Sequence, residues 1–309
     1  MSAPVIDKPG VYDIDMGTYH SDCAWLPSLS SGDLVAISKN PAKWYAYHWS
    51  NPKRFKRPET DALRIGKAAH ALVTGGEDFK EHYAIRPARF TDWKTKASKA
   101  WRDKREGDGI TVITIEQMRL IKGMARALKS SPEAMQIFEV GRPEQSLFWE
   151  SQGVVLKARP DVIPIQDARI ICDYKTVASV EPRKLMRAIL DFGWAQKLAN
   201  VTAGMIATVP TGAAGFEDFD FVLICQEKSP PFEVVCVTIP HTHIADLMRL
   251  NEAAVAEFIK SREDGFWRGA NDGFVEYHDE EWKLASMASR YGGLNGLPGY
   301  KDHFRKDAA

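Results

Sequence analysis

The spacing of hydrophobic residues changes along the chain, and each change predicts a different kind of element. In the N-terminal part, hydrophobic positions recur every three or four residues, which is typical of helices that bury one face. Ser28, Ser30 and Ser31 are typical helix caps before the first of them, and Asn40-Pro41 is expected to end it. The predicted helical segments are 33–37, 44–47, 61–73, 115–129 and 132–138.

Further along, the spacing shortens to alternation, which predicts strands. Segments 144–150, 154–161 and 169–176 are expected to form a β-meander, with turns at Gly153 and 164–168.

Helical spacing then returns and is interrupted once more. The remaining predicted elements are a long helix over 182–207, a hairpin of strands 219–226 and 232–239 around Pro230-Pro231, and a closing helix over 242–262. This succession predicts a mixed α/β (α+β) fold with a central mixed sheet flanked by helices.

The domain organisation follows from these elements. We expect a single elaborated domain over 31–270, with a basic helical insertion at about 86–130. Residues 1–30 are expected to be an N-terminal extension, and 271–309 a C-terminal extension with a flexible tail.

Composition indicates a soluble globular protein, with 44% hydrophobic and 27% charged residues. The 41 basic residues balance 41 acidic ones, so any contact with nucleic acid must use a local patch. The stretch 86–105 is the most basic, and Phe90, Trp93 and Trp101 are interleaved with its charges. It is equally compatible with tracking a DNA strand and with a solvated helix whose tryptophans pack inward. Its candidate DNA contacts are Lys94, Lys96, Lys99 and Arg102.

Cysteine usage and the absence of targeting signals bear on location. The four cysteines, Cys23, Cys172, Cys225 and Cys236, include no CxxC pair and are expected to be small core residues. No stretch is apolar for long enough to span a bilayer, and no signal peptide is recognisable. A reducing cytoplasm is the expected location.

The candidate chemistry lies on two predicted strands. Alternation puts Asp173 and Lys175 on one face of the later strand, and Lys157, Arg159 and Asp161 on one face of the earlier strand. Two charged faces are therefore expected on neighbouring strands.

A hairpin centred near Asp167 would place Asp161 opposite Asp173. Facing carboxylates repel unless a cation lies between them, and Mg²⁺ is the natural occupant because it binds oxygen ligands. Mg²⁺ also keeps several waters, so it can position a water nucleophile and neutralise a phosphate. The ammonium of Lys175 can orient or deprotonate that water, or stabilise developing charge.

These residues resemble a known signature. Pro160-Asp161 followed by Asp173-Tyr174-Lys175 is similar to the PD-(D/E)xK motif of nucleases, which implies a restriction-endonuclease-like core. Further motifs occur in the order found in RecE-type exonucleases, the exodeoxyribonuclease VIII family of phages and prophages. They are Asn40-Pro41-Ala42, Gly66-x-x-x-His70, Glu144-x-Ser146, Lys157-Ala-Arg-Pro-Asp161, Gln196 and Glu227-Lys228-x-Pro230-Pro231.

The resemblance implies roles for individual residues. The implied metal ligands are His70, Asp161, Asp173 and the backbone carbonyl of Tyr174. The implied catalytic residues are Asp161, Asp173, Lys175 and Gln196.

Other positions keep two interpretations. Glu144 is either an exposed strand residue or a group near the metal, Arg159 either flanks the site or contacts phosphate, and His70 alone would more often be a core residue. Family members tend to have tyrosines around the glutamine, where this chain has Trp194 and Val201.

The activity implied is degradation of linear double-stranded DNA from its ends, 5′ to 3′, with Mg²⁺ and with Mn²⁺ as a substitute. The implied setting is a homo-oligomer, phage or prophage encoded, that supplies a single-strand annealing recombinase in a bacterial cytoplasm. No iron–sulfur cluster or zinc is expected from the cysteine spacing, and no ATP use, because a GxxxxGK[ST] loop is absent.

Two alternatives remain. An endonuclease on the same fold would share the metal chemistry. A DNA-binding scaffold with an inactive site would typically have lost Lys175 or an acidic ligand, and this sequence retains them.

Overall fold

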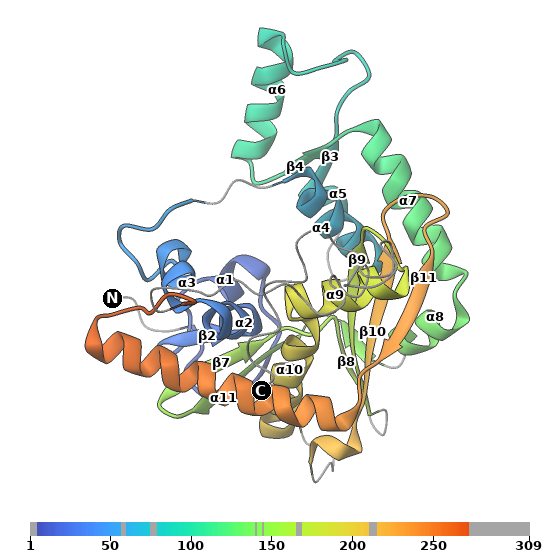
Figure 1. The fold of residues 1–309 in the computed structure, drawn as a ribbon. Coiled ribbons are helices and arrows are strands. Elements are labelled where there is room, and N and C mark those ends of the chain that lie inside the picture. The colour runs from blue at the N-terminus through green and yellow to red at the C-terminus, as the bar shows by residue number, and fades with distance from the viewer. Residues whose placement is uncertain are drawn as a thin grey trace, which may run out of the picture. The chain divides into compact units, whose positions relative to one another are not determined.

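The computed structural model describes residues 5–56, 60–74, 79–139, 141–143, 145–164, 169–209 and 215–271. The chain divides into two compact units, Met1–Arg268 and Gly269–Ala309, and the described helices and strands all lie in the first. Figure 1 labels its elements. The helices are α1 (Met16–His20), α2 (Ser31–Lys39), α3 (Pro41–Tyr47), α4 (Asp61–Thr74), α5 (Phe79–His82), α6 (Lys96–Gly107), α7 (Ile115–Lys129), α8 (Pro132–Glu139), α9 (Pro182–Phe192), α10 (Trp194–Thr208), the 3-10 turn η1 (Phe216–Asp218) and α11 (His241–Asp264).

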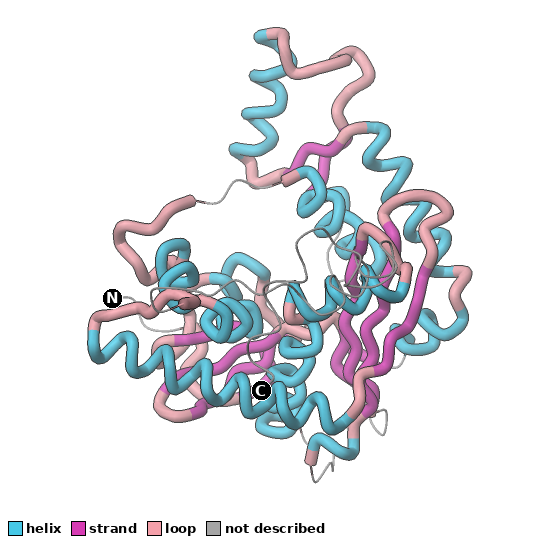
Figure 2. Tube along the Cα trace, viewed as in Figure 1, coloured by secondary structure: helices cyan, strands magenta, loops and turns pink. Residues whose placement is uncertain are grey.

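The strands form separate groups with helices around them (Figure 2). They are β1 (Gly10–Tyr12), β2 (Ser28–Ser30), β3 (Tyr83–Ile85), β4 (Thr111–Ile113), β5 (Gly141–Pro143), β6 (Ser146–Ser151), β7 (Val154–Ala158), β8 (Val162–Pro164), β9 (Ile170–Val177), β10 (Asp220–Glu227) and β11 (Val234–Thr238). Within the described ranges, one sheet has the order β1-β6-β7-β2, a second has the order β11-β10-β9-β8-β5, and β3 pairs with β4.

Both larger sheets are mixed. β9 and β10 run parallel while β10 and β11 form the expected antiparallel hairpin, and β2 runs parallel to β7 beside the antiparallel pair β6–β7. The predicted mixed α/β class, with sheets flanked by helices, is confirmed. β1 and β2 come from the segment expected to be an N-terminal extension, and both pair within the first sheet.

The expected β-meander is wrong at one point. The predicted strand 154–161 ends at Ala158 as β7, and a separate short strand, β8, begins at Val162 in the other sheet. Pro160 lies at the break, and proline has no N–H to donate to a strand ladder. The chain therefore leaves the first sheet at Arg159-Pro160 and enters the second after Asp161.

The expected helix 182–207 is also divided, into α9 and α10, at Gly193. This residue has φ +62°, and a Cβ built on it would lie 2.5 Å from Val35 Cγ1. A side chain at this position would be strained and would collide with α2, so glycine turns the chain here.

Two hydrophobic cores lie on opposite faces of β9. Ile171 and Val177 belong to the core that contains most of α10, whereas Cys172 and Tyr174 belong to the core built with α7 and α8. Because side chains alternate along a strand, these four residues show which of the two faces each remaining side chain of β9 points to.

Helix boundaries agree well with the sequence pattern where capping residues are present. α2 begins after Ser30, which forms a capping box with Asp33, and α7 begins after Thr114, which forms one with Gln117.

Cys23, Cys172 and Cys225 are buried, as expected for core residues. No helix in the described ranges is long and apolar enough to cross a bilayer.

Candidate active site

The site is centred on the start of β8 and the middle of β9. Their antiparallel register pairs Val162 with Cys172, so the next position along each strand brings Asp161 opposite Asp173. This is the spacing expected for a hairpin centred near Asp167, although 165–168 lie outside the described residues. By alternation, Asp173 and Lys175 face the side of the sheet that α10 covers.

Asp161 is held by two hydrogen bonds. Its Oδ2 accepts from the backbone N–H of Tyr174 at 2.5 Å, and its Oδ1 lies 2.7 Å from Nε2 of His70. Burial raises the pKa of Asp161, but the charge and hydrogen bond of His70, with a further contribution from Lys175, hold that pKa far below its ordinary value. Asp161 is therefore an ionised carboxylate with only 7% of its surface exposed.

His70 reaches Asp161 because α4 lies close to β9. A Cβ built on Gly66 would be only 3.0 Å from Oγ1 of Thr176, the residue after Lys175. Gly66 and His70 are four residues apart and so share one face of the helix. The Gly-x-x-x-His spacing thus has a physical explanation, because the glycine permits the approach that brings the histidine to the carboxylate.

Asp173 forms an ion pair with Lys175. Their Oδ2 and Nζ atoms are 2.6 Å apart, and Nζ also donates to the carbonyl of Tyr174 at 3.3 Å. Burial raises the pKa of Asp173, and the negative charge of Asp161 adds to that increase. Burial alone would lower the pKa of Lys175, but the charges of Asp173 and Asp161 raise it.

The expected metal ligands are thus joined in two pairs. The imidazole of His70 is paired with Asp161, and the ammonium of Lys175 joins Asp173 to the carbonyl of Tyr174. In this arrangement, no three His, Cys, Asp or Glu side chains among the described residues are grouped to hold a metal.

The donor set nevertheless fits a hard divalent cation. Adjacent ligands of an octahedral ion at about 2.1 Å lie about 3 Å apart, close to the 2.7 Å that separates His70 from Asp161. A cation, the Lys175 ammonium, already lies against two of the expected ligand oxygens.

Gln196 is not brought to the carboxylates. It is 4% exposed, and its Nε2 donates to Asn251 Oδ1 at 3.0 Å and to Ser38 Oγ at 3.2 Å. These contacts join α10 to α11 and α2. The neighbouring Trp194 and Val201 are buried in the core.

The charged residues of β7 and the turn after it are engaged within the protein. Lys157 is 3% exposed and donates to the carbonyls of Tyr19 and Ser21, while Arg159 Nη1 donates to the carbonyl of Ile14 and to Ser146 Oγ. Glu144, a candidate for a position near the metal, lies outside the described residues.

The basic stretch forms an arm, residues 86–110, between β3 and β4 (Figure 1). Trp93 and Trp101 stack on each other at 6.4 Å, and the guanidinium groups of Arg86 and Arg102 lie over Trp93 at 5.3 and 5.4 Å. The tryptophans thus pack within the arm, as the inward-packing interpretation expected.

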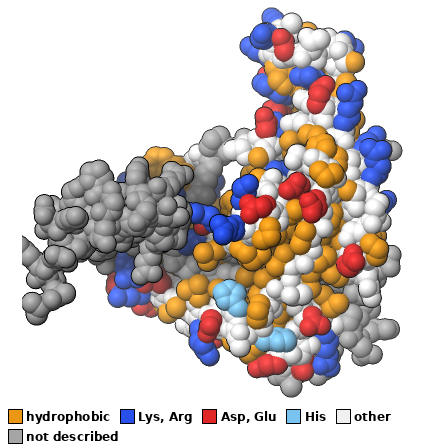
Figure 3. Space-filling view, turned by 45° about the vertical axis from the view of Figure 1, so that its right-hand side comes forward, with side chains coloured by type: hydrophobic (Ala, Val, Ile, Leu, Met, Phe, Trp, Pro, Cys, Tyr) orange, Lys and Arg blue, Asp and Glu red, His pale blue; other side chains and the backbone are white. Residues whose placement is uncertain are grey.

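The lysines of the arm are directed differently from its tryptophans. Lys94, Lys96 and Lys99 are exposed, and Figure 3 shows basic side chains around this part of the surface. Lys94 lies 3.8 Å from Asp92, and Arg102 contacts Asp103 at 3.2 Å.

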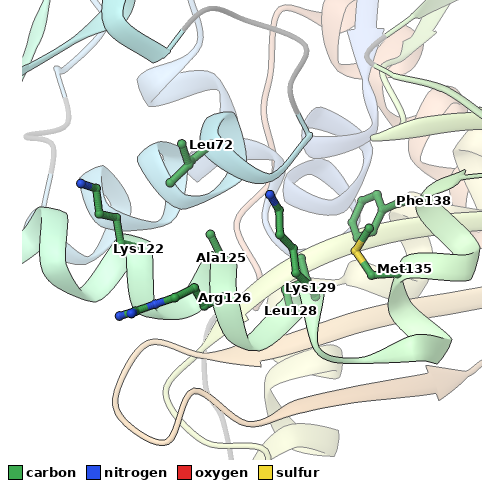
Figure 4. Close-up of a pocket in the computed structure, with 8 residues that line it drawn as sticks. All are labelled: Leu72, Lys122, Ala125, Arg126, Leu128, Lys129, Met135 and Phe138. Atoms are coloured by element: carbon green, nitrogen blue, oxygen red, sulfur yellow. The ribbon is translucent and has the colours of Figure 1, made fainter.

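A separate hollow of about 400 Å³ lies between α4, α7 and α8 (Figure 4). Its described lining is apolar with a basic rim of Lys122, Arg126 and Lys129, and includes no carboxylate. Leu128 of its wall packs in the same core as Tyr174, so the hollow lies among helices that cover the other face of β9. It is not part of the carboxylate site.

Comparison with known proteins agrees with this geometry. A family model described as "PDDEXK-like domain of unknown function (DUF3799)" matches residues 30–272. The chain belongs to this PDDEXK-like family. The match covers both strands of the site and supports a nuclease.

One solved structure gives the same fold. The PDDEXK-like chain is similar to the crystal structure of a candidate exonuclease from Eubacterium rectale, with a TM-score of 0.60 and 10% identity, over 89% of this chain and 99% of that one. A structure described as SSO0001 matches with a TM-score of 0.24 and 13% identity over 66% of this chain and 88% of that one, which is too weak to carry an argument. No curated protein matches significantly.

Proposed function

We propose that this PDDEXK-like protein is a metal-dependent exodeoxyribonuclease that degrades linear double-stranded DNA from its ends. The observation that carries the proposal is the convergence of Asp161, Asp173 and Lys175 at one position on adjoining strands, with His70 alongside. Two carboxylates so close together in a largely buried site are unfavourable without compensation, and here Asp173 is paired with the Lys175 ammonium while Asp161 is hydrogen-bonded to the His70 imidazole.

In this proposal His70, Asp161, Asp173 and the Tyr174 carbonyl hold Mg²⁺, with Mn²⁺ able to substitute. When bound, the ion supplies a water of lowered pKa and neutralises charge on the phosphate. The protein residues do the rest: Asp161 stays fixed by the Tyr174 N–H, which keeps one of its oxygens oriented.

Lys175 has a second role in this proposal. When DNA binds, the ion pair between Lys175 and Asp173 opens, and Lys175 contacts the DNA instead. Its three N–H donors are then free to orient the attacking water and to stabilise charge on the phosphate oxygens. The partial burial of Lys175 strengthens both interactions, because charges interact more strongly where water is partly excluded.

The arm is proposed to follow the DNA backbone through Lys94, Lys96 and Lys99, whose side chains are exposed. Arg102 is proposed to contribute less, because it stacks on Trp93 and pairs with Asp103. Arg159 and Gln196 are proposed to support the site from within the fold rather than to contact DNA.

The finer features of the proposal rest on the resemblance to RecE-type exonucleases. They are 5′ to 3′ polarity, a homo-oligomeric assembly, a single-strand annealing recombinase as the partner, and a phage or prophage origin with action in the bacterial cytoplasm. The candidate exonuclease among the similar structures is consistent with action on ends.

The test is digestion of linear duplex DNA labelled at either its 5′ or its 3′ end, with Mg²⁺ or with EDTA. Wild type is compared with Lys175→Ala and with Lys260→Ala, whose lysine is exposed on α11. We expect digestion that requires metal and Lys175 but not Lys260, with early release of the 5′ label and no cutting of covalently closed circles.

Each other outcome has a definite meaning. Cutting of closed circles would replace the exonuclease by an endonuclease. Absence of digestion by folded wild type that binds metal would favour an inactive scaffold.

A further inference from the structure

Lys197 is the only charged residue of α10, a helix that is mostly buried from Trp194 to Met205. The residues on both sides of it, Gln196 and Leu198, are buried, while Lys197 itself is partly buried. Charged side chains in such a helix are unfavourable unless they are paired or needed for function. Its position therefore requires an explanation that the core does not provide.

The helix lies over the face of the sheet that carries the carboxylate site. Ile171 and Val177, which have the same parity along β9 as Asp173 and Lys175, pack in the core with α10. Lys197 lies near the start of this helix, which begins directly after Gly193. Asp173 and Lys175 are the charged groups it faces from β9, and Lys39 is the one from α2.

The ammonium of Lys197 has no hydrogen bond or ion pair within the described residues. Its neighbours both have partners: Lys175 pairs with Asp173, and Lys39 Nζ donates to the carbonyls of Leu190 and Asp191 at the end of α9. Burial lowers the pKa of Lys197, and repulsion from Lys175 lowers it further. Its ammonium is therefore available to an anionic ligand.

The local charges indicate which anion fits. Two carboxylates, Asp161 and Asp173, balance the two ammonium groups of Lys175 and Lys197, and Lys39 of α2 adds a further positive charge. A divalent cation at the carboxylates would leave this group of charges positive, and a DNA phosphate is the complementary anion.

We propose that Lys197 binds a non-bridging phosphate oxygen of the DNA strand at the cleavage site, as a second cationic contact beside Lys175. The inference rests on the proposed nuclease function and deepens it. Lys197 then recognises the strand backbone without regard to base, and its charge acts on both the bound and the reacting phosphate.

The decisive variant is Lys197→Met, which keeps the length of the side chain and removes its charge. We expect the digestion rate to fall by roughly 10²-fold, as for loss of one transition-state donor. The melting temperature should stay the same or rise, because an unpaired, partly buried charge is removed. Lys197→Arg should recover part of the rate, and Lys260→Met, an exposed lysine of α11, should behave as wild type.

Binding separates a phosphate contact from a structural role. In a Lys175→Ala background, which prevents cleavage, the affinity for duplex DNA with recessed and blunt ends is measured against salt concentration. Adding Lys197→Met should reduce the steepness of log K against log salt by about 0.9, the value for one phosphate contact. The Lys260→Met control should leave the slope unchanged.

The outcomes distinguish the two proposals. Digestion by Lys197→Met at the wild-type rate, or an unchanged salt slope, overturns the role of Lys197 while the nuclease stands. If wild type does not digest DNA, the proposed function fails, and the salt slope still decides whether Lys197 contacts phosphate.

Discussion

Strands β7 and β9 each carry one lysine, Lys157 and Lys175. The two lysines differ in the kind of group that they contact. Lys157 of β7 donates to the main-chain carbonyls of Tyr19 and Ser21, at 2.8 and 3.2 Å. Lys175 of β9 pairs with the side chain of Asp173. Carbonyls of a packed segment are fixed, so Lys157 is part of the fold, whereas a side-chain ion pair can be exchanged for a ligand.

The difference shows that a charged strand face does not identify a site by itself. Sequence alternation put Lys157 and Asp161 on one charged face, yet the structure covers Lys157 with the N-terminal segment. What distinguishes the β9 face is that its charges neutralise one another.

The largest effect is expected from Asp173→Asn. Loss of the charge removes a proposed metal ligand. The metal would supply several kcal/mol of transition-state stabilisation, and losing it corresponds to roughly a 10³-fold fall in digestion rate. Because burial raises the pKa of Asp173, its ionised form disfavours the folded state, and the amide should leave the melting temperature within a few degrees. Asp191→Asn, at an exposed aspartate of α9, is the control. If Asp173→Asn unfolds, Asp173 is a charge that the fold needs, as Lys157 is.

Lys157→Met should have the opposite effect. Two main-chain carbonyls lose their donor, which should lower the free energy of unfolding by about 2 to 6 kcal/mol, at about 1 to 3 kcal/mol for each unsatisfied group. The digestion rate per folded molecule should be unchanged at low temperature. Urea denaturation measures the free energy of unfolding, and digestion of end-labelled duplex DNA, normalised to the amount of folded protein, measures the rate. Normal stability would show that the two lysines do not differ as described.

Gly66→Ala tests the approach of α4 to β9. The added methyl would meet Thr176 Oγ1 at 3.0 Å and should displace His70 from Asp161, lowering the digestion rate by roughly tenfold. Adding Thr176→Ala removes that contact and should restore part of the rate. Gly107→Ala, where a Cβ meets nothing within 4 Å, is the matched control. Equal loss in the single and double variants would contradict this explanation.

The smallest effect is expected on the arm. Lys96→Ala or Lys99→Ala should each weaken DNA binding by about two- to threefold at low salt, since exposed charge pairs contribute about 0.2 to 1 kcal/mol. Thermal stability should not change, because both side chains are exposed. Affinity measured by fluorescence anisotropy, with Lys260→Ala as the control, decides whether the arm contacts DNA at all.

Much of this arrangement could be predicted from local signals. α7 has the predicted bounds because Thr114 and Gln117 cap it, and the register of Asp161 with Asp173 follows from counting residues around one turn. Both depend on residues close together in sequence.

Long-range features could not be predicted in the same way. The parallel pairing of β9 with β10 joins strands separated by two helices, and no local pattern encodes which edge the later strand joins. Glycine weakens the interior of any helix, but the close approach of Gly193 to Val35 of α2 is visible only in three dimensions. A sequence signal for Lys197 was present, as the lone charge in a hydrophobic helix, and it became interpretable once its neighbours were known.

The hydrogen bond from the Tyr174 amide to Asp161 has a consequence for solvent exchange. This amide donates to a carboxylate rather than to a strand carbonyl, so its protection depends on the charge and position of Asp161 as well as on the sheet. Its deuterium exchange rate can therefore serve as an internal reporter of the site. The amide of Ile224, buried on the neighbouring strand, provides the reference for opening of the sheet as a whole.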